Sequence, residues 1–428
     1  MRASRRVVVA GLLAVACSGD GPGPGTTPAQ LVLTASPASA TAGVPLSPAV
    51  KVSVLDSKGN VATSFQGGVH VALAANPGGA TLSGTTTVSA TAGVATFSNL
   101  MLDKSGTGYT LVVSSNGLAG DTSSALTVVP GAVSAAQSSV SAAPAAIAAS
   151  TGSSAATVTV TARDAFGNLV PGVTVSLAAT GSGNTITPPP GPTDAAGVAK
   201  GTLSSTVAGT KTVSATAGGV SVSQTASVVV AAGSAIRLRF VTQPTNAAAG
   251  AVISPPLQLE ARDVFGNLAT SYTGNVTIAI AASPAPGTLS GTKTVPMANG
   301  AASFGDLSID KVGAGYTLQV TASPVLTPDT STSFDITAGP PAKLAFGQQP
   351  TSTTAGATIA PAVTVRILDA VGNLTGSTAN VTIAITAGTG TAGAHLSGVS
   401  SVTVAAVAGV ATFSGLSVDS VGTGYSLT

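Results

Sequence analysis

The sequence predicts an all-β protein made of four tandem β-sandwich domains in an elongated array, with the last domain incomplete. Three observations support this prediction. Apolar and polar residues alternate in short runs, 52 Gly and 26 Pro residues interrupt those runs, and one five-residue pattern occurs four times. Val and Thr favour pleated, half-buried surfaces, whereas Gly and Pro favour turns. The apolar content of 44% is too high for a typical disordered chain.

The five-residue pattern is Asp-x-x-Gly-Asn, and its glycines lie 108, 99 and 106 residues apart. An Asp side chain accepts hydrogen bonds from the amides that follow it, Gly supplies a positive φ, and Asn tolerates the left-handed region. We therefore interpret the pattern as a structural turn. A calcium loop is the alternative, but it needs about six to eight oxygen ligands and each copy offers one carboxylate. The turn residues are Asp56, Gly59, Asn60, Asp164, Gly167, Asn168, Asp263, Gly266, Asn267, Asp369, Gly372 and Asn373.

Alternating runs flank each turn. Before the fourth turn, Val363, Val365 and Ile367 alternate with Thr364 and Arg366, so one set faces inward and the other faces water. About seven such segments fit within each ~100 residues, which is the pattern of an immunoglobulin-like β-sandwich. The four repeats are expected over residues 31–129, 132–230, 235–338 and 341–428.

Large side chains recur at matching places in repeats one, three and four. The phenylalanines of the Ala-Thr-Phe or Ala-Ser-Phe segments are expected in the core, and they are Phe97, Phe304 and Phe413. A tyrosine follows each Gly-x-Gly and is predicted to form a tyrosine corner, in which the hydroxyl bonds a nearby backbone group. The alternative is a repeated, exposed ligand contact. These tyrosines are Tyr109, Tyr316 and Tyr425.

The second repeat carries a family resemblance. The stretches DAFGNLVPGVTV, TDAAGVAKGTL and AGTKTVSAT within residues 158–219 resemble a bacterial Ig-like domain of the intimin/invasin type. The other three repeats resemble related Ig-like repeats of bacterial surface proteins. The resemblance implies extended extracellular repeats of the kind found in adhesins, but a fold does not fix a ligand.

Residues 1–17 read as an export signal. Three arginines precede the apolar run 7–16, which is too short to cross a bilayer because a span needs about 20 apolar residues. Cys17, the only cysteine, follows Ala-Val-Ala and resembles the lipidated cysteine of bacterial lipoproteins; an ordinary signal peptide is the alternative. We expect a membrane anchor on Cys17, a flexible Gly/Pro tether over 18–30, and a location at the cell surface or in the periplasm.

The fourth repeat is expected to lack its final strand. Tyr109 and Tyr316 are each followed by a further strand pattern, whereas only Ser-Leu-Thr follows Tyr425. A truncated sequence would explain this difference, and so would a strand supplied by a partner.

No pattern indicates catalysis, a cofactor or a metal. His70 and His395 stand where other repeats carry Thr, and neither recurs. The sequence has no phosphate-binding loop, dinucleotide fingerprint or zinc-ligand spacing. With 16 Lys and Arg and 3% aromatic residues it offers no basic, stacking surface for nucleic acid. The Asn-Val-Thr sequons at 275–277 and 380–382 are interpreted as strand residues.

The sequence therefore predicts a non-catalytic protein of the cell surface, a lipid-anchored stalk of Ig-like repeats with a structural or adhesive role. A host cell, a neighbouring cell or a polysaccharide is the partner class we expect, and self-association is left open. The alternatives are a stalk whose enzyme or carbohydrate-binding domain lies beyond Thr428, and a repeat that itself binds polysaccharide. The sequence contains no Trp and few other aromatic residues, which disfavours the last of these.

Overall fold

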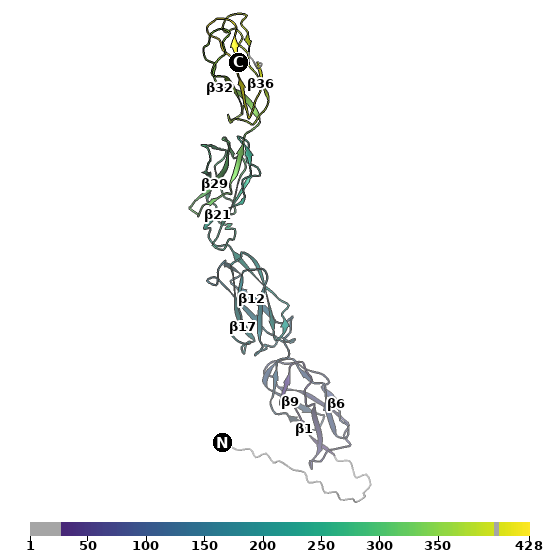
Figure 1. Cartoon of the computed structure of the whole chain (residues 1–428). Helices are drawn as coiled ribbons and strands as arrows, with labels where there is room; N and C mark the ends of the chain where they lie inside the picture. The colour runs from purple at the N-terminus through teal and green to yellow at the C-terminus, as the bar shows by residue number, and fades with distance from the viewer. Residues whose placement is uncertain (1–26, 398–401) are drawn as a thin grey trace. The chain divides into compact units, whose positions relative to one another are not determined.

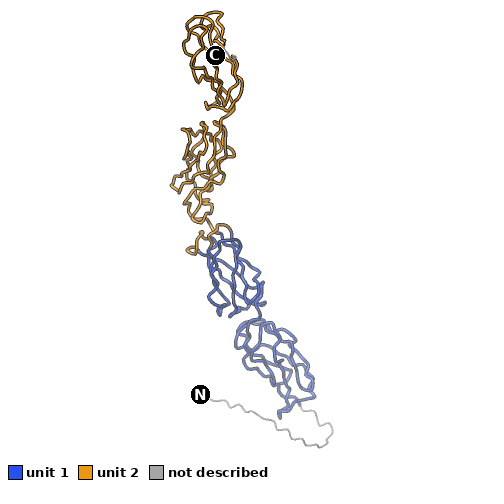
Figure 2. Tube along the Cα trace, in the orientation of Figure 1, with its two compact units in different colours: residues 1–146, 155–204, 210–229 blue, residues 147–154, 205–209, 230–428 orange. Residues whose placement is uncertain are grey.

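The computed structural model describes residues 27–397 and 402–428. Every regular element in these two ranges is a β-strand, so the all-β prediction is confirmed. The described residues contain no helix that could cross a membrane. The chain divides into two compact units, coloured separately in Figure 2. The first holds the described residues up to Ala146 together with 155–204 and 210–229, and the second holds 147–154, 205–209 and the chain from Val230.

Repeat 1 is a sandwich of two antiparallel-dominated sheets (Figure 1). The smaller sheet has the order β1(Pro28–Ala35), β3(Val50–Asp56), β7(Val94–Phe97). The larger has the order β2(Ser39–Thr41), β11(Leu126–Val129), β9(Gly106–Ser114), β4(Gly68–Ala75), β6(Thr87–Ser89), with β10(Asp121–Thr122) beside β9. A short pair, β5(Leu82–Ser83) and β8(Met101–Leu102), stands apart from both sheets. Within this arrangement β2 and β11 run parallel, and the other pairs are antiparallel.

The core of repeat 1 follows from the two-residue period of its strands. Val50, Val52 and Val54 of β3 are fully buried, whereas the intervening Lys51 is exposed. They belong to a cluster that includes Phe97, which is 1% exposed. Burying each such side chain stabilises the fold by about 1.5–3 kcal/mol. Because no disulfide crosses the described repeats, this burial carries their stability.

Strand β1 begins earlier than the sequence predicts. Its first residue, Pro28, pairs with Asp56 and lies inside the stretch 18–30 assigned to the tether. Proline is tolerated at the first position of a strand, where its missing N–H is not needed for the ladder. Cys17 and residues 18–26 lie outside the described residues.

Repeat 3 has the strand order of repeat 1. Its smaller sheet is β21(Arg237–Thr242), β23(Leu257–Arg262), β27(Ala301–Phe304). Its larger sheet is β22(Ala247–Ala248), β31(Phe334–Thr337), β29(Gly313–Ser323), β24(Asn275–Ala282), β26(Thr294–Pro296), with β30(Asp329–Thr330) beside β29. The pair β25(Leu289–Ser290) and β28(Ser308–Ile309) completes it. The shared order shows that the two sequence repeats fold in the same way.

Repeat 2 has a different arrangement, as its divergent sequence suggests. One sheet has the order β12(Ser139–Ala143), β14(Ala156–Thr161), β17(Val198–Ser205), β16(Asn184–Thr187). The other has the order β13(Ala146–Ala148), β20(Ala226–Ala231), β18(Gly209–Ala217), β15(Val175–Ala179), with β19(Val220–Ser221) beside β18. Here β16 adds an edge strand that repeats 1 and 3 do not have in this position.

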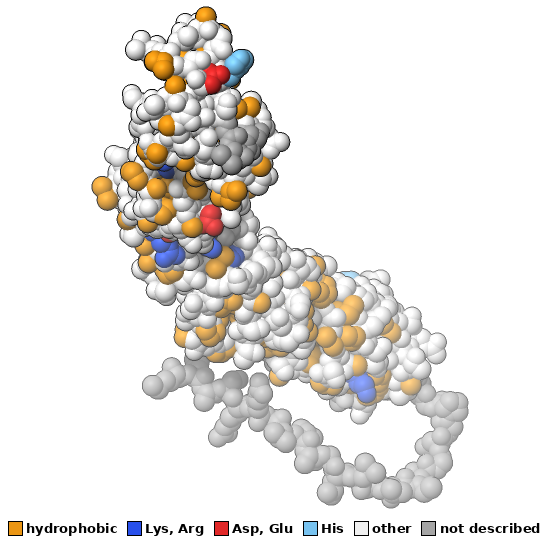
Figure 3. All heavy atoms as spheres, turned by 45° about the horizontal axis from the view of Figure 1, so that its top comes forward, with side chains coloured by type: hydrophobic (Ala, Val, Ile, Leu, Met, Phe, Trp, Pro, Cys, Tyr) orange, Lys and Arg blue, Asp and Glu red, His pale blue; other side chains and the backbone are white. Residues whose placement is uncertain are grey.

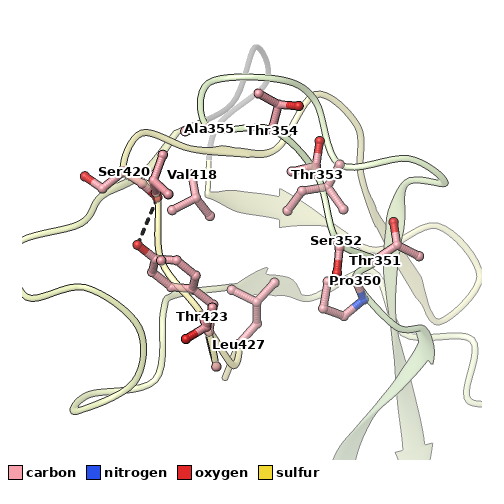
Figure 4. A pocket seen from close by; sticks show the side chains of 15 residues that line it. Pro350, Thr351, Ser352, Thr353, Thr354, Ala355, Val418, Ser420, Thr423 and Leu427 are labelled. Atoms are coloured by element: carbon pink, nitrogen blue, oxygen red, sulfur yellow. Dashed lines mark hydrogen bonds between the residues drawn. The ribbon is translucent and has the colours of Figure 1, made fainter.

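The described residues of repeat 4 form fewer strands than those of repeats 1 and 3. They form the sheet β32(Pro341–Gln348), β33(Val363–Asp369), β37(Val410–Phe413), and the pairs β34(Asn380–Thr382) with β36(Thr403–Ala405) and β35(Leu396–Ser397) with β38(Ser417–Val418). A pocket of about 540 Å³ lies between the segments 350–355 and 418–427 (Figure 4). Repeat 1 places β11 between the corresponding segments, β2 and β9.

Candidate functional site: the Asp-x-x-Gly-Asn turns

Each turn is closed by its own aspartate. In repeat 2, Asp164 is 1% exposed, and its Oδ1 accepts hydrogen bonds from the amides of Phe166 and Asn168, both at 2.9 Å. The Asn168 side chain donates from Nδ2 to Asp164 Oδ2 at 2.8 Å. Gly167 supplies the positive φ of 81° that the turn needs. The turn is therefore held by short bonds within five residues.

The other three turns repeat this geometry. In every copy, Oδ1 of the turn aspartate accepts hydrogen bonds from two backbone amides, at 2.8–3.1 Å. The donors are Lys58 and Asn60 to Asp56, Phe265 and Asn267 to Asp263, and Val371 and Asn373 to Asp369. In the first turn the Asn60 side chain is farther from Asp56 Oδ2, at 3.4 Å. The corresponding bonds in the third and fourth turns are both 2.9 Å.

In three of the turns the second carboxylate oxygen also holds the linker that leads into the repeat. Asp164 Oδ2 accepts the amide of Gly131 at 2.8 Å, and Asp263 Oδ2 accepts that of Gly233 at 2.9 Å. In the fourth repeat the donor is the amide of Gly339, at 3.1 Å. Each of these glycines lies just outside the bounds that the sequence predicts for its repeat.

The charged form of these carboxylates is the stable one. Burial by itself would raise the pKa of Asp164, but the hydrogen bonds from Asn168, Gly131 and Phe166 outweigh it and bring the pKa below its ordinary value. The same balance lowers the pKa of Asp263 and Asp369. These aspartates are therefore ionised at neutral pH.

The hydrogen bonds leave Asp164 little capacity for a cation. A carboxylate has about four lone-pair positions, and four N–H donors point at this one: two amides at Oδ1, and the Gly131 amide and the Asn168 side chain at Oδ2. Across residues 27–397 and 402–428, no group of three or more His, Cys, Asp or Glu side chains is placed to hold a metal ion. The geometry favours a structural turn over a calcium loop.

The asparagine of the turn also bonds a segment of the preceding repeat, which the sequence reasoning missed. Asn168 Nδ2 donates to the carbonyl of Asp103 at 2.8 Å, and Asn168 Oδ1 accepts the amide of Ser105 at 3.0 Å. Within the second unit, Asn373 and Asn267 make the matching pairs of bonds, to Asp310 and Val312 and to Thr206 and Ala208. The sequence signal that could have indicated these inter-repeat bonds is the apolar residue, Phe or Val, in the third position of these turns.

The three tyrosines are bonded to their own loops. Each hydroxyl donates to the carbonyl five residues earlier: Tyr109 to Lys104 at 3.0 Å, Tyr316 to Lys311 at 2.9 Å and Tyr425 to Ser420 at 3.0 Å. Tyr109 and Tyr316 are fully buried, and burial raises the pKa of the Tyr109 phenol. The phenols of Tyr109 and Tyr316 therefore offer no exposed surface for a ligand, whereas Tyr425 is half-buried and lines the pocket of repeat 4.

The histidines lie on exposed strand and loop positions in different repeats. His70 Nδ1 is 3.1 Å from the hydroxyl oxygen of Thr87, and the His395 backbone amide donates to Asp419 at 2.9 Å. On the face shown in Figure 3, charged side chains are few and scattered among uncharged ones. A shallow hollow of about 490 Å³ is lined by three prolines with Asp194 and Lys200, a set with no nucleophile beside a base.

Comparison with known proteins gives one family match, in the second repeat. Residues 137–229, within the second repeat, match the family model described as the bacterial Ig-like domain (group 1). No curated protein matches the chain. Among solved structures, the Escherichia coli adhesin FdeC is 22% identical with a TM-score of 0.37, over 71% of this chain and 96% of its own. Invasin, described as a bacterial integrin-binding protein, is 16% identical with a TM-score of 0.35, over 79% of this chain and 76% of its own.

Proposed function

We propose that this chain is a non-catalytic protein of the bacterial cell surface, in which tandem Ig-like repeats serve as a structural or adhesive stalk. The proposal rests on how the recurring aspartates of the turns are bonded. In repeats 2–4 the turn aspartates are taken up by backbone amides and by asparagine side chains, so they build the fold and are not free for chemistry. The bacterial Ig-like family of the second repeat supports the surface assignment.

Adhesion is the functional part of this proposal. Purified protein is expected to bind an epithelial cell layer or a polysaccharide array in a saturable way and to show no hydrolase activity toward the surface that it binds. A non-adherent bacterium that displays the chain is expected to gain adhesion to the same surface. If display gives no adhesion to any cell or glycan tested, the adhesive role is rejected and the structural role remains.

We also propose that Cys17 carries a lipid anchor. The apolar run before it and the Gly/Pro stretch after it support a lipidated cysteine followed by a tether. Cys17→Ser is expected to abolish labelling by a radioactive fatty acid and to move the protein from the membrane fraction to the soluble fraction. Labelling and fractionation that do not change would reject the anchor. Ser18→Ala is the matched control and should leave both readouts as they are.

A further inference from the structure

In the turns of repeats 2 and 4, the third residue lies against a glycine of the preceding repeat. In the first unit, a side-chain carbon built on Gly43 would run into the ring of Phe166. In the second unit, the same carbon on Gly250 would lie 2.9 Å from Val371 Cγ1. Both glycines have positive φ values, 74° and 76°. Glycine therefore lets the apolar residue approach, although Phe166 keeps 43% of its surface exposed and the contact is partial.

The hydrogen bonds of the asparagine orient this contact. The carboxamide of Asn168 uses both of its N–H groups, one on Asp164 of its own turn and one on the Asp103 carbonyl, and its oxygen takes the Ser105 amide. A carbonyl and the amide two residues further on are the groups that one residue binds across a parallel ladder. The side chain thus pairs with the preceding repeat as a strand residue would, and at 8% exposure it does so largely out of water.

The first turn differs from the others, and no described repeat precedes it. Its third residue is Lys58, where the later turns have Phe166, Phe265 and Val371. Lys58 and Asn60 are exposed, and the only side-chain bond recorded for Asn60 within the described residues is the one to Asp56. A lysine keeps its charge in water and does not pack against a glycine surface. The four copies of one turn therefore differ at the position that would face a neighbour.

We propose that the Asp-x-x-Gly-Asn turns of repeats 2 and 4 are docking sites for the preceding repeat. An apolar residue beside a buried asparagine binds an extended loop and a glycine of the neighbour. One such contact is small, but the short linker gives it a high effective concentration. This assignment goes beyond the proposed surface function and does not depend on it.

The hydrogen exchange of the Ser105 amide provides a direct test, because this amide donates a hydrogen bond to Asn168 Oδ1. In the full chain, Asn168→Ala is expected to speed the hydrogen exchange of this amide by about tenfold, read by NMR, since the net value of one hydrogen bond corresponds to a change of that order. The matched control is Asn60→Ala. It removes the same residue from a turn whose asparagine side chain, within the described residues, bonds only its own aspartate, and it should leave the exchange of Ser105 unchanged.

Two further measurements separate docking from folding of the turn. The amides of Val158 and Val160 in β14 should stay protected in Asn168→Ala, which shows that repeat 2 remains folded. Asn168→Asp keeps the oxygen that accepts the Ser105 amide but places a negative charge against the Asp103 carbonyl and Asp164, so it should open the contact further than alanine does. Equal Ser105 exchange in the wild type and Asn168→Ala, with β14 protected, would overturn the proposal.

Discussion

At the scale of single residues, the turn aspartates show how a buried charge is kept. A carboxylate out of water is costly unless hydrogen bonds replace its hydration. Asp263 has 0% exposure and meets this requirement with two turn amides, one linker amide and one asparagine side chain. A mutation that removes one donor leaves part of that charge without a hydrogen bond. Acid removes the charge itself, so these positions are sensitive to both.

Acid is expected to weaken repeats 2–4. The pKa values of Asp164, Asp263 and Asp369 lie below the ordinary value in the folded state. The unfolded state therefore binds protons first, and the stabilisation is fully present above the ordinary carboxyl pKa of about 3.9 and is lost as the pH falls through the lower folded-state pKa. The thermal midpoint, followed by circular dichroism, should be flat from about pH 7 to 5 and fall below about pH 4.

The variant Asp164→Asn provides the check on this prediction. It removes one titrating group, so it should lower the midpoint at pH 7 and reduce the further loss in acid. A wild-type midpoint that is the same at about pH 3 and pH 7 would contradict the prediction.

At the scale of elements, the alternating pattern predicted the long strands well, because each has one buried face. Val363, Val365 and Ile367 were expected to face inward, and each is at most 5% exposed. Two-residue strands such as β5 and β8, and the parallel pairing of β2 with β11, were not predictable. They depend on contacts between segments far apart in the sequence, and two residues carry no periodic signal.

The candidate site shows the same division between local and distant information. The turn itself was predictable because Asp, Gly and Asn act on neighbouring amides. The bonds that Asn168 donates to Asp103 and accepts from Ser105 were not predictable, since they join residues more than 60 positions apart. Only the change from Lys58 to Phe166 between turns hinted at them, and that change has meaning only when the neighbouring surface is known.

The hairpin turn before β7 offers a stabilising substitution. Thr91 and Val94 exchange backbone hydrogen bonds around Ala92 and Gly93, both of which have positive φ, at 50° and 76°. Two-residue turns with this geometry favour Asn-Gly, and the left-handed region is unfavourable for alanine. Ala92→Asn is expected to raise the free energy of unfolding of repeat 1 by about 1 kcal/mol. Native-state exchange of β3 core amides measures it.

Repeat 3 allows the opposite substitution to be made at the matching position. Its matching turn already has Asn299 before Gly300, with φ values of 51° and 73°. Asn299→Ala should therefore destabilise repeat 3 by a similar amount. Loss of stability in Ala92→Asn, or no change in either variant, would show that turn preference does not limit these hairpins.

At the scale of the whole chain, stability is attributed to the buried cores of several small sandwiches. The single cysteine lies outside the described repeats, and charged residues make up 7% of the sequence. The buried clusters of repeats 1, 3 and 4 are separate sets of Val, Leu, Ile and aromatic side chains. Each of these three repeats therefore has a core of its own, and the contacts between repeats add to it.

Calcium is expected to make no difference to the chain. The turn carboxylates of repeats 2–4 already accept amide and carboxamide donors, so neither a chelator nor millimolar Ca²⁺ should move the thermal midpoint. Differential scanning calorimetry with and without each addition measures this. A reproducible rise of several degrees with Ca²⁺, absent in Asp164→Asn, would restore the metal-loop interpretation.

The linker glycines have a practical consequence for anyone who cuts this chain into pieces. Gly131, Gly233 and Gly339 precede the first residues that an alignment of the repeats would select, yet each donates to the buried aspartate of the repeat that follows. A fragment that starts two residues too late would lose that donor and leave an anion short of a partner. Such a fragment would be less stable than the same repeat in the full chain, and the cause would be the position of the cut.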